Sequence, residues 1–153
     1  MDEKWMLKAL AEARTAALEG DVPVGAVIVH DDQIIASAHN EKEKKGDATA
    51  HAEILCVKRA CDLLGRWRLS DCTLYVTMEP CPMCAGALWN ARIGRVVYGI
   101  KDPVAGSIRS VWSFSDSPMH WRPEVTGGVL ADECLELLST FFKNRRKQES
   151  ETR

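Results

Sequence analysis

The sequence predicts an α/β fold in which helices cover a mixed β-sheet, and three observations support this. Helix-like apolar spacing alternates with short strand-like apolar runs, in the order helix, two strands, helix, strand, helix, strand, then a late strand and helix. Two of the strand-like runs are separated only by an aspartate-rich turn, which indicates an antiparallel hairpin. Two others flank a single helix, which indicates a parallel pair joined by a crossover.

The composition fits one globular domain over residues 1–153, since 46% of the residues are hydrophobic and 27% are charged. The longest apolar runs have strand length and the N-terminus is charged, so we expect no membrane span, no signal peptide and a cytoplasmic protein. The net charge of −2 disfavours a strongly basic nucleic-acid binder but leaves room for a local basic face. The six cysteines are spread through a chain that is large enough to fold without disulfides.

The first elements along the chain are a helix and a hairpin. Residues 5–18 are apolar at every third or fourth position, and Gly20 follows as the stop. Residues 24–29 and 33–38 are the expected strands of the hairpin. The segment 41–47 is highly charged and is expected to be a surface loop.

A second helix is predicted over residues 50–64, with Asp47 or Thr49 as its cap. This prediction places His51 and Glu53 in the first helical turn.

The crossover is predicted from a β-branched run at 72–77, a helix at 81–90 and an apolar strand at 95–99. Pro82 lies where a helix tolerates proline in its first turn. Cys81 therefore also lies at a helix start, where the partial positive charge favours thiolate over thiol.

The pattern is weaker in the last third of the chain. Residues 101–123 show no clear periodicity, and 124–130 are a plausible short strand. A last helix is predicted over 131–148, and residues 143–153 are expected to form a charged, frayed tail.

Two short motifs carry the predicted chemistry: HAE at residues 51–53 and EPCPMC at residues 79–84. The imidazole of His51 and the thiolates of Cys81 and Cys84 are three of the four ligands that tetrahedral zinc prefers. A site with only three protein ligands leaves one position for water, which is the catalytic pattern. This spacing is the signature of the zinc-dependent nucleobase deaminases.

Glu53 is expected to take a proton from water and pass it to a substrate. Simpler interpretations exist for each residue. Cys81 and Cys84 alone fit a structural zinc site or a thioredoxin-like redox pair. His51 alone fits a helix cap, and Glu53 fits a first-turn glutamate favoured by the helix dipole. The absence of a second metal-binding motif and the pairing of the two motifs favour catalytic zinc.

Beyond these motifs, the sequence resembles the tRNA-specific adenosine deaminases over nearly its whole length. The similar segments are 22–27, 39–40, 49–53, 67–69, 73–77, 79–87, 91–99, 128–134 and 141–142. The resemblance implies a three-layer fold of the cytidine-deaminase type, with about five strands and helices on both faces. It also implies one Zn²⁺ per chain, a homodimer, and conversion of adenosine to inosine at the wobble position of a tRNA anticodon, with release of ammonia.

The resemblance further implies roles for residues around the zinc. The expected substrate contacts are Asn40, the backbone N–H of Ala52, Val24 and Pro80. An amide such as that of Asn40 can donate and accept toward a base edge, although asparagine after a strand is also typical of a turn. Glu79 is expected to have a structural role or to support the metal ligands.

Positively charged residues are the expected RNA contacts. Lys143, Arg145 and Arg146 cluster on the last helix, where the resemblance suggests that the RNA approaches. Basic residues in a final turn also favour the helix dipole, so this cluster has a purely structural interpretation too.

The loop 101–123 departs from the family pattern, with the bulkier residues Ile108, Arg109, Trp112, Phe114 and Trp121. An arginine or tryptophan there can stack on an unpaired base or fill the groove that admits an RNA loop. The sequence therefore leaves a second function open: a deaminase of a free nucleobase or nucleoside, of guanine, cytosine or adenosine type, with a tryptophan closing the pocket. A non-catalytic zinc or redox protein ranks third.

Overall fold

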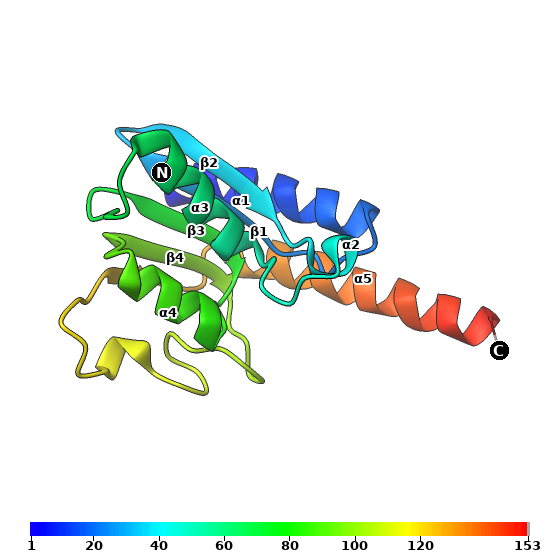
Figure 1. Cartoon of the computed structure of the whole chain (residues 1–153). Coiled ribbons are helices and arrows are strands. Elements are labelled where there is room, and N and C mark those ends of the chain that lie inside the picture. Colours follow the sequence, from blue (N-terminus) through cyan, green and yellow to red (C-terminus); the bar gives the residue numbers. More distant parts are fainter. Residues whose placement is uncertain (153) are drawn as a thin grey trace.

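A five-stranded mixed sheet forms the middle layer of the molecule (Figure 1), as seen in a computed structural model that describes residues 1–152. The strand order is β2-β1-β3-β4-β5. The strands are β1 Gly25–His30, β2 Gln33–His39, β3 Thr73–Met78, β4 Arg95–Ile100 and β5 Glu124–Thr126. β1 pairs antiparallel with β2 and β3, whereas β4 runs parallel to β3 and β5. The predicted hairpin and the predicted parallel crossover are confirmed.

Helices cover both faces of this sheet (Figure 1). α1 (Asp2–Leu18) and α5 (Ala131–Glu151) lie on one face, and α3 (Ala52–Leu64) and α4 (Pro82–Asn90) lie on the other. The short helix α2 (Lys42–Lys45) follows β2. No helix among residues 1–152 combines the length and the apolar character needed to cross a membrane. The three-layer α/β fold expected from the sequence is confirmed.

The hydrophobic core has two parts, because successive side chains of each strand point to opposite faces of the sheet. Val27 and Val29 pack against α1, and their neighbours Ala26 and Ile28 pack against α3 and α4. Because successive side chains of a strand point to opposite faces, a strand covered on both sides must be apolar at every position. This explains why β1 is an uninterrupted apolar run in the sequence.

Two expectations next to the site were wrong. The segment 41–47 is not entirely loop, because it contains α2. Neither Asp47 nor Thr49 caps the following helix, which begins at Ala52 with His51 as its N-cap. The Asp47 carboxylate instead accepts the N–H and the hydroxyl of Thr49 in a local turn.

The C-terminal part also differs from the expectation. β5 ends at Thr126, because Gly128 adopts a φ of +85° and turns the chain toward α5. α5 continues to Glu151 instead of fraying from about residue 143. Its residues include neither glycine nor proline, so no local signal ends the helix earlier.

α1 packs directly on the backbone of β1 at Gly25, where an added Cβ would clash with the Ala9 carbonyl oxygen and the Ala13 nitrogen. We expect Gly25→Ala to lower the free energy of unfolding by about 1–3 kcal/mol, because the helix must move away from the sheet. Urea unfolding measures this change. The matched control is Gly86→Ala in α4, where no atom lies within 4 Å of the added Cβ. Equal stability of the Gly25→Ala variant and the unmodified protein would contradict this packing.

Candidate metal centre and active site

The predicted ligands meet at the carboxyl end of β3, where α3 and α4 begin. His51 is the N-cap of α3 and Cys81 is the N-cap of α4, with Cys84 one turn further on. Neither N-cap side chain makes a capping hydrogen bond to its own helix. The imidazole and the thiols therefore face one another.

The spacing of these three donor atoms fits a metal ion. Nδ1 of His51 lies 3.6 Å from the sulfur of Cys81 and 3.6 Å from the sulfur of Cys84. A tetrahedral zinc ion with Zn–N of about 2.0–2.1 Å and Zn–S of about 2.3 Å separates nitrogen and sulfur by roughly 3.5–3.6 Å. Because the observed separations equal the expected one, the three residues form a group that can hold a metal without rearrangement.

The charges of the two thiols also suit a cation. The hydrogen bond from Cys84, and then the bond with His51, lower the pKa of Cys81 to about 4 despite its burial, so this thiol is ionised at neutral pH. The bond to Cys81 and burial raise the pKa of Cys84, which keeps its proton in the metal-free protein. A cation bound by both sulfurs favours the loss of that proton as well.

Glu53 lies in the first turn of α3 and is only 4% exposed. Burial raises the pKa of this carboxyl group to about 7, and the negative charge on Cys81 acts in the same direction. A carboxyl group that is partly protonated at neutral pH is suited to proton transfer. A cation at the neighbouring ligands would lower this pKa.

A cavity of about 250 Å³ opens beside these groups. This is somewhat smaller than the roughly 300 Å³ at which pockets for drug-sized ligands begin, so a single base fits it better than a larger group. The lining residues are Val22, Val24, Asn40, Lys42, His51, Ala52, Glu53, Met78, Glu79, Cys81 and Asp102. Three of the four predicted substrate contacts are among them. Pro80 is buried outside this lining, and its carbonyl oxygen accepts the N–H of Ser107.

The amide of Asn40 is held in a fixed orientation. Its Nδ2 donates to the Val22 carbonyl at 3.2 Å, and its Oδ1 accepts the N–H of Lys42 at 3.1 Å. An asparagine amide has two donor hydrogens and can accept twice, so one donor and one acceptor position remain for a ligand.

Asp21 supports the part of the cavity that contains Asn40 and Lys42. This carboxylate is fully buried and accepts the N–H groups of Glu43 at 2.8 Å and Lys44 at 3.1 Å. These bonds tie α2, and with it Lys42, to the segment before β1. Buried charge is tolerated because the amide donors replace water.

Glu79 makes structural contacts, which is one of the two roles expected for it. Its hydrogen-bond partners lie in the loop after β4: the N–H groups of Asp102, Ile108, Arg109 and Ser110, and the Ser110 hydroxyl. Among the hydrogen bonds of residues 1–152, none joins the Glu79 carboxylate to a ligand side chain. Burial raises the pKa of Glu79, but the bonds from Arg109 and Ser110 outweigh it and leave the pKa below its ordinary value.

The sequence alone missed Val22, Lys42, Met78 and Asp102 as cavity residues. A signal for Asp102 existed: it follows β4, whose carboxyl end must lie beside that of the parallel strand β3. Lys42 lies in a segment interpreted as loop and had no such signal.

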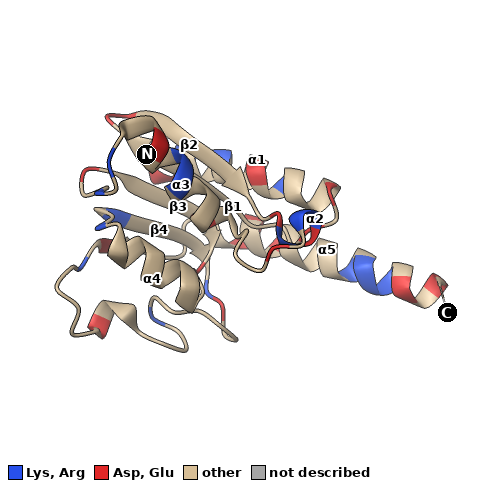
Figure 2. Ribbon diagram, viewed as in Figure 1, with Lys and Arg blue, Asp and Glu red and all other residues tan. Residues whose placement is uncertain are grey.

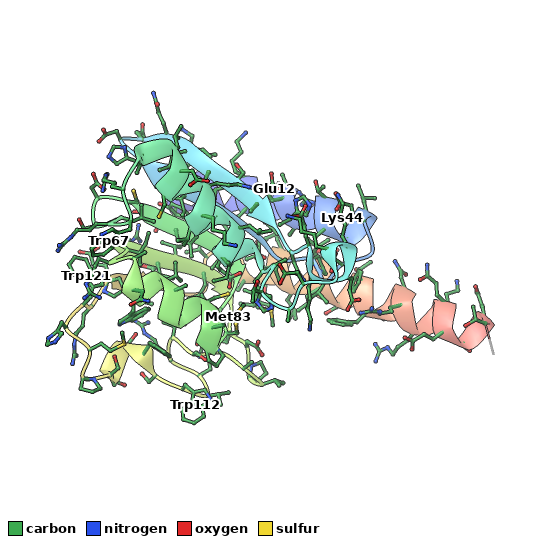
Figure 3. The ribbon with its side chains drawn as sticks, in the orientation of Figure 1. Glu12, Lys44, Trp67, Met83, Trp112 and Trp121 are labelled. Atoms are coloured by element: carbon green, nitrogen blue, oxygen red, sulfur yellow. The ribbon has the colours of Figure 1, made fainter. Side chains whose placement is uncertain are left out.

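The bulky residues of the long loop lie at different places (Figure 3). Trp121 lies near Trp67 at the opposite end of the sheet, where its Nε1 donates to the Ile93 carbonyl. It therefore does not close the cavity, which overturns that part of the second interpretation. Trp112 is 64% exposed and points away from the sheet. Arg109 donates to the Val125 carbonyl at 3.3 Å and is largely exposed.

The basic residues of α5 lie on the part of this helix that extends beyond the sheet (Figure 2). Lys143 and Arg146 are exposed. Arg145 is half-buried, with its guanidinium 5.6 Å from the centre of the Phe141 ring.

Comparisons with known proteins agree with this site. The family model for MafB19-like deaminases matches residues 1–146. The tRNA-specific adenosine deaminase of Bacillus subtilis is 44% identical, over 99% of this chain and 95% of its own. The chain belongs to the tRNA-specific adenosine deaminase family. The resemblance found in the sequence is thereby confirmed.

Solved structures share this fold, and two of them differ in the activity for which they are named. A structure from a study of A-to-I editing by tRNA:A34 deaminases superposes on this deaminase with a TM-score of 0.86 at 44% identity, covering 88% of this chain and 99% of that one. A guanine deaminase from Bacillus subtilis gives a TM-score of 0.62 at 42% identity, covering 65% of this chain and 64% of that one.

We expect the metal-free deaminase to bind one cobalt(II) ion per chain, with the intense near-ultraviolet absorption that thiolate ligands produce. Cys84→Ala should weaken that absorption by about half or more, because it removes one of the two sulfurs. Cys61→Ser, which changes a half-buried cysteine outside the group, is the control. Unchanged absorption in the Cys84→Ala variant would contradict the assigned ligands.

Proposed function

We propose that this protein is a zinc-dependent hydrolytic deaminase that converts adenosine to inosine at the wobble position of a tRNA anticodon and releases ammonia. The observation that carries the proposal is the donor group of His51, Cys81 and Cys84 beside a buried carboxyl group, Glu53, in one cavity. The relatives and solved structures named for tRNA:A34 or tRNA-specific adenosine deaminases support RNA as the substrate.

Glu53 moves the protons in this reaction. When bound, zinc lowers the pKa of a water molecule and so supplies a nucleophile near neutral pH. The Glu53 carboxylate would accept a proton from the attacking water and deliver it to the ring nitrogen beside the attacked carbon. It would then carry the remaining hydroxyl proton to the amine, which leaves as ammonia as the C=O bond forms. Its burial keeps bulk water from competing for these protons.

The walls of the cavity orient the base. The free donor and acceptor positions of Asn40 face the base edge, and the N–H of Ala52, in the first turn of α3, has no acceptor within its own helix. Val24 and Met78 supply apolar contacts to the ring faces.

A wobble adenosine lies in a single-stranded loop and can be extruded into a pocket sized for one base. We propose the exposed residues Lys143 and Arg146 as contacts for the phosphates of the RNA, with Arg109 and Arg145 as further candidates. We propose the cytoplasm as the protein's place of action, in line with its bacterial tRNA-modifying relatives.

The protein is also proposed to act as a homodimer. Ala85, Leu88 and Trp89 of α4 belong to the core, so they are not available to a second copy. The apolar surface that remains beside α4 comprises Ala87 and the 61% exposed Trp67. A second chain covering it would remove this tryptophan from water.

A deaminase of a free purine such as guanine is the second candidate. The specific observation in its favour is the 42% identity to a guanine deaminase over 65% of this chain. The exposed position of Trp112 removes one argument for it, because this side chain does not cover the cavity.

A substrate panel separates the two candidates. We expect the zinc-loaded protein to form inosine in an anticodon stem-loop with adenosine at the wobble position, and to leave free bases and nucleosides unchanged. Ammonia release and nucleoside analysis measure both. Turnover of guanine with the RNA untouched would replace the first candidate by the second.

We expect Glu53→Gln to retain zinc and to lose activity by a factor of about 10²–10⁴, the contribution of a positioned acid–base group. Metal analysis and single-turnover kinetics measure the two quantities. Glu3→Gln, which changes an exposed carboxylate on α1, is the matched control. Full activity of the Glu53→Gln variant would remove the proton-transfer role.

We expect reversal of the charges of Lys143 and Arg146 to weaken tRNA binding. Losing two single-strand phosphate contacts makes the slope of log K against log salt shallower by about 1.4. Titrations at several salt concentrations measure this slope. Reversal of Lys4 and Lys8 on α1 changes the same number of exposed charges and is the control. Identical slopes for both double variants would exclude this face of α5.

A further inference from the structure

We propose that Glu79 is a positioning residue that suspends the loop between Asp102 and Ser110 against the cavity and thereby sets the position of one cavity wall. This inference rests on the proposed function, because that wall is part of the substrate site. We expect Glu79 to act through the loop and not through the metal ligands, although it is only two residues from Cys81.

The carboxylate holds the loop at both ends. Oε1 accepts the N–H of Asp102 at 3.1 Å and the hydroxyl of Ser110. Oε2 accepts the N–H groups of Ile108, Arg109 and Ser110 at 3.1, 2.9 and 3.1 Å. Glu79 itself is only 2% exposed, so these donors satisfy a charge that water does not reach.

The loop backbone approaches this carboxylate closely. A Cβ at Gly106 would clash with Glu79 Oε1 and with the Asp102 carbonyl oxygen. The N–H of Ser107 donates to the Pro80 carbonyl at 2.9 Å, which adds a second link to the turn before α4. The loop is therefore docked on the metal-binding turn by its backbone.

The hydrogen bonds that anchor the loop to Glu79 depend little on the identity of the loop side chains. Four of its five bonds come from backbone N–H groups, which every residue except proline provides. Side chains away from the anchor, such as Val104 at 84% exposure and Trp112, are free to vary. Ile108 is buried in the core, whereas the side chain of Arg109 is exposed, so only the latter can vary without repacking the loop.

The consequence concerns substrate binding more than chemistry. Glu79 and Asp102 both line the cavity, whereas the proton-transfer group and the ligands lie on α3 and α4. A displaced wall weakens contacts that ground state and transition state share, which raises KM and leaves kcat nearly unchanged.

The test uses Glu79→Gln, which keeps the size of the side chain but replaces one acceptor oxygen by a donor group. We expect faster hydrogen exchange at the amides of Ile108, Arg109 and Ser110, and one metal ion per chain as before. We also expect KM for the anticodon stem-loop to rise about tenfold, with kcat changed by less than about threefold.

Two further variants test the same contact by changing the loop instead of Glu79. Gly106→Ala pushes the loop off the same anchor while Glu79 stays intact, so it should reproduce the rise in exchange and in KM. Ser110→Ala removes a single bond and should give a smaller change in the same direction, which serves if Glu79→Gln does not fold. Asp71→Asn is the control, because it weakens an ion pair with Arg66 at the other end of the sheet.

Metal loss, or a fall in kcat at constant KM, would overturn the proposal and return Glu79 to ligand support. Unchanged exchange and unchanged KM would overturn it as well. The exchange and metal measurements need no substrate, so they decide the inference even if the protein proves inactive on tRNA and the proposed function fails.

Discussion

The parallel pairing of β3 with β4 fixes where the chemistry of this molecule is placed. A crossover between parallel strands returns the chain to the same starting edge, so both strands end at the same edge of the sheet. The turn after β3 carries Glu79 and Cys81 there, and the turn after β4 brings Asp102. The antiparallel neighbour β1 begins at this edge, which places Val24 opposite them. Three sides of the cavity thus follow from one sheet.

Negative charge is concentrated at this edge, and each charge is balanced in a different way. Cys81 is stabilised as a thiolate by Cys84 and His51. Glu79 is stabilised as a carboxylate by amide donors of the loop, which hold its pKa below the ordinary value. Glu53 has few such partners and keeps a high pKa for that reason. The same type of side chain is therefore a fixed anchor in one place and a titrating group in another.

The sequence predicted what depends on short spacings. The strands of the sheet and the trio of His51 and the two motif cysteines follow from local patterns. What it missed depends on contacts between segments that are far apart in the sequence. Asp21, for example, binds α2, although β1 and β2 lie between them along the chain. The direction in which α5 faces also depends on tertiary contacts. Leu137 packs on the core while Leu135 stays 53% exposed, and only the neighbouring sheet decides between them.

The first turns of α3 and α4 are not capped by side-chain hydrogen bonds from their own N-cap residues. His51 and Cys81 occupy the N-cap positions without bonding to the first-turn amides. In most helices that position secures the end against fraying. In this protein the two ends are secured through each other, since the cap side chains form one shared cluster. Loosening one helix end therefore loosens the other, and anything that binds the cluster reinforces two distant stretches of the chain at once.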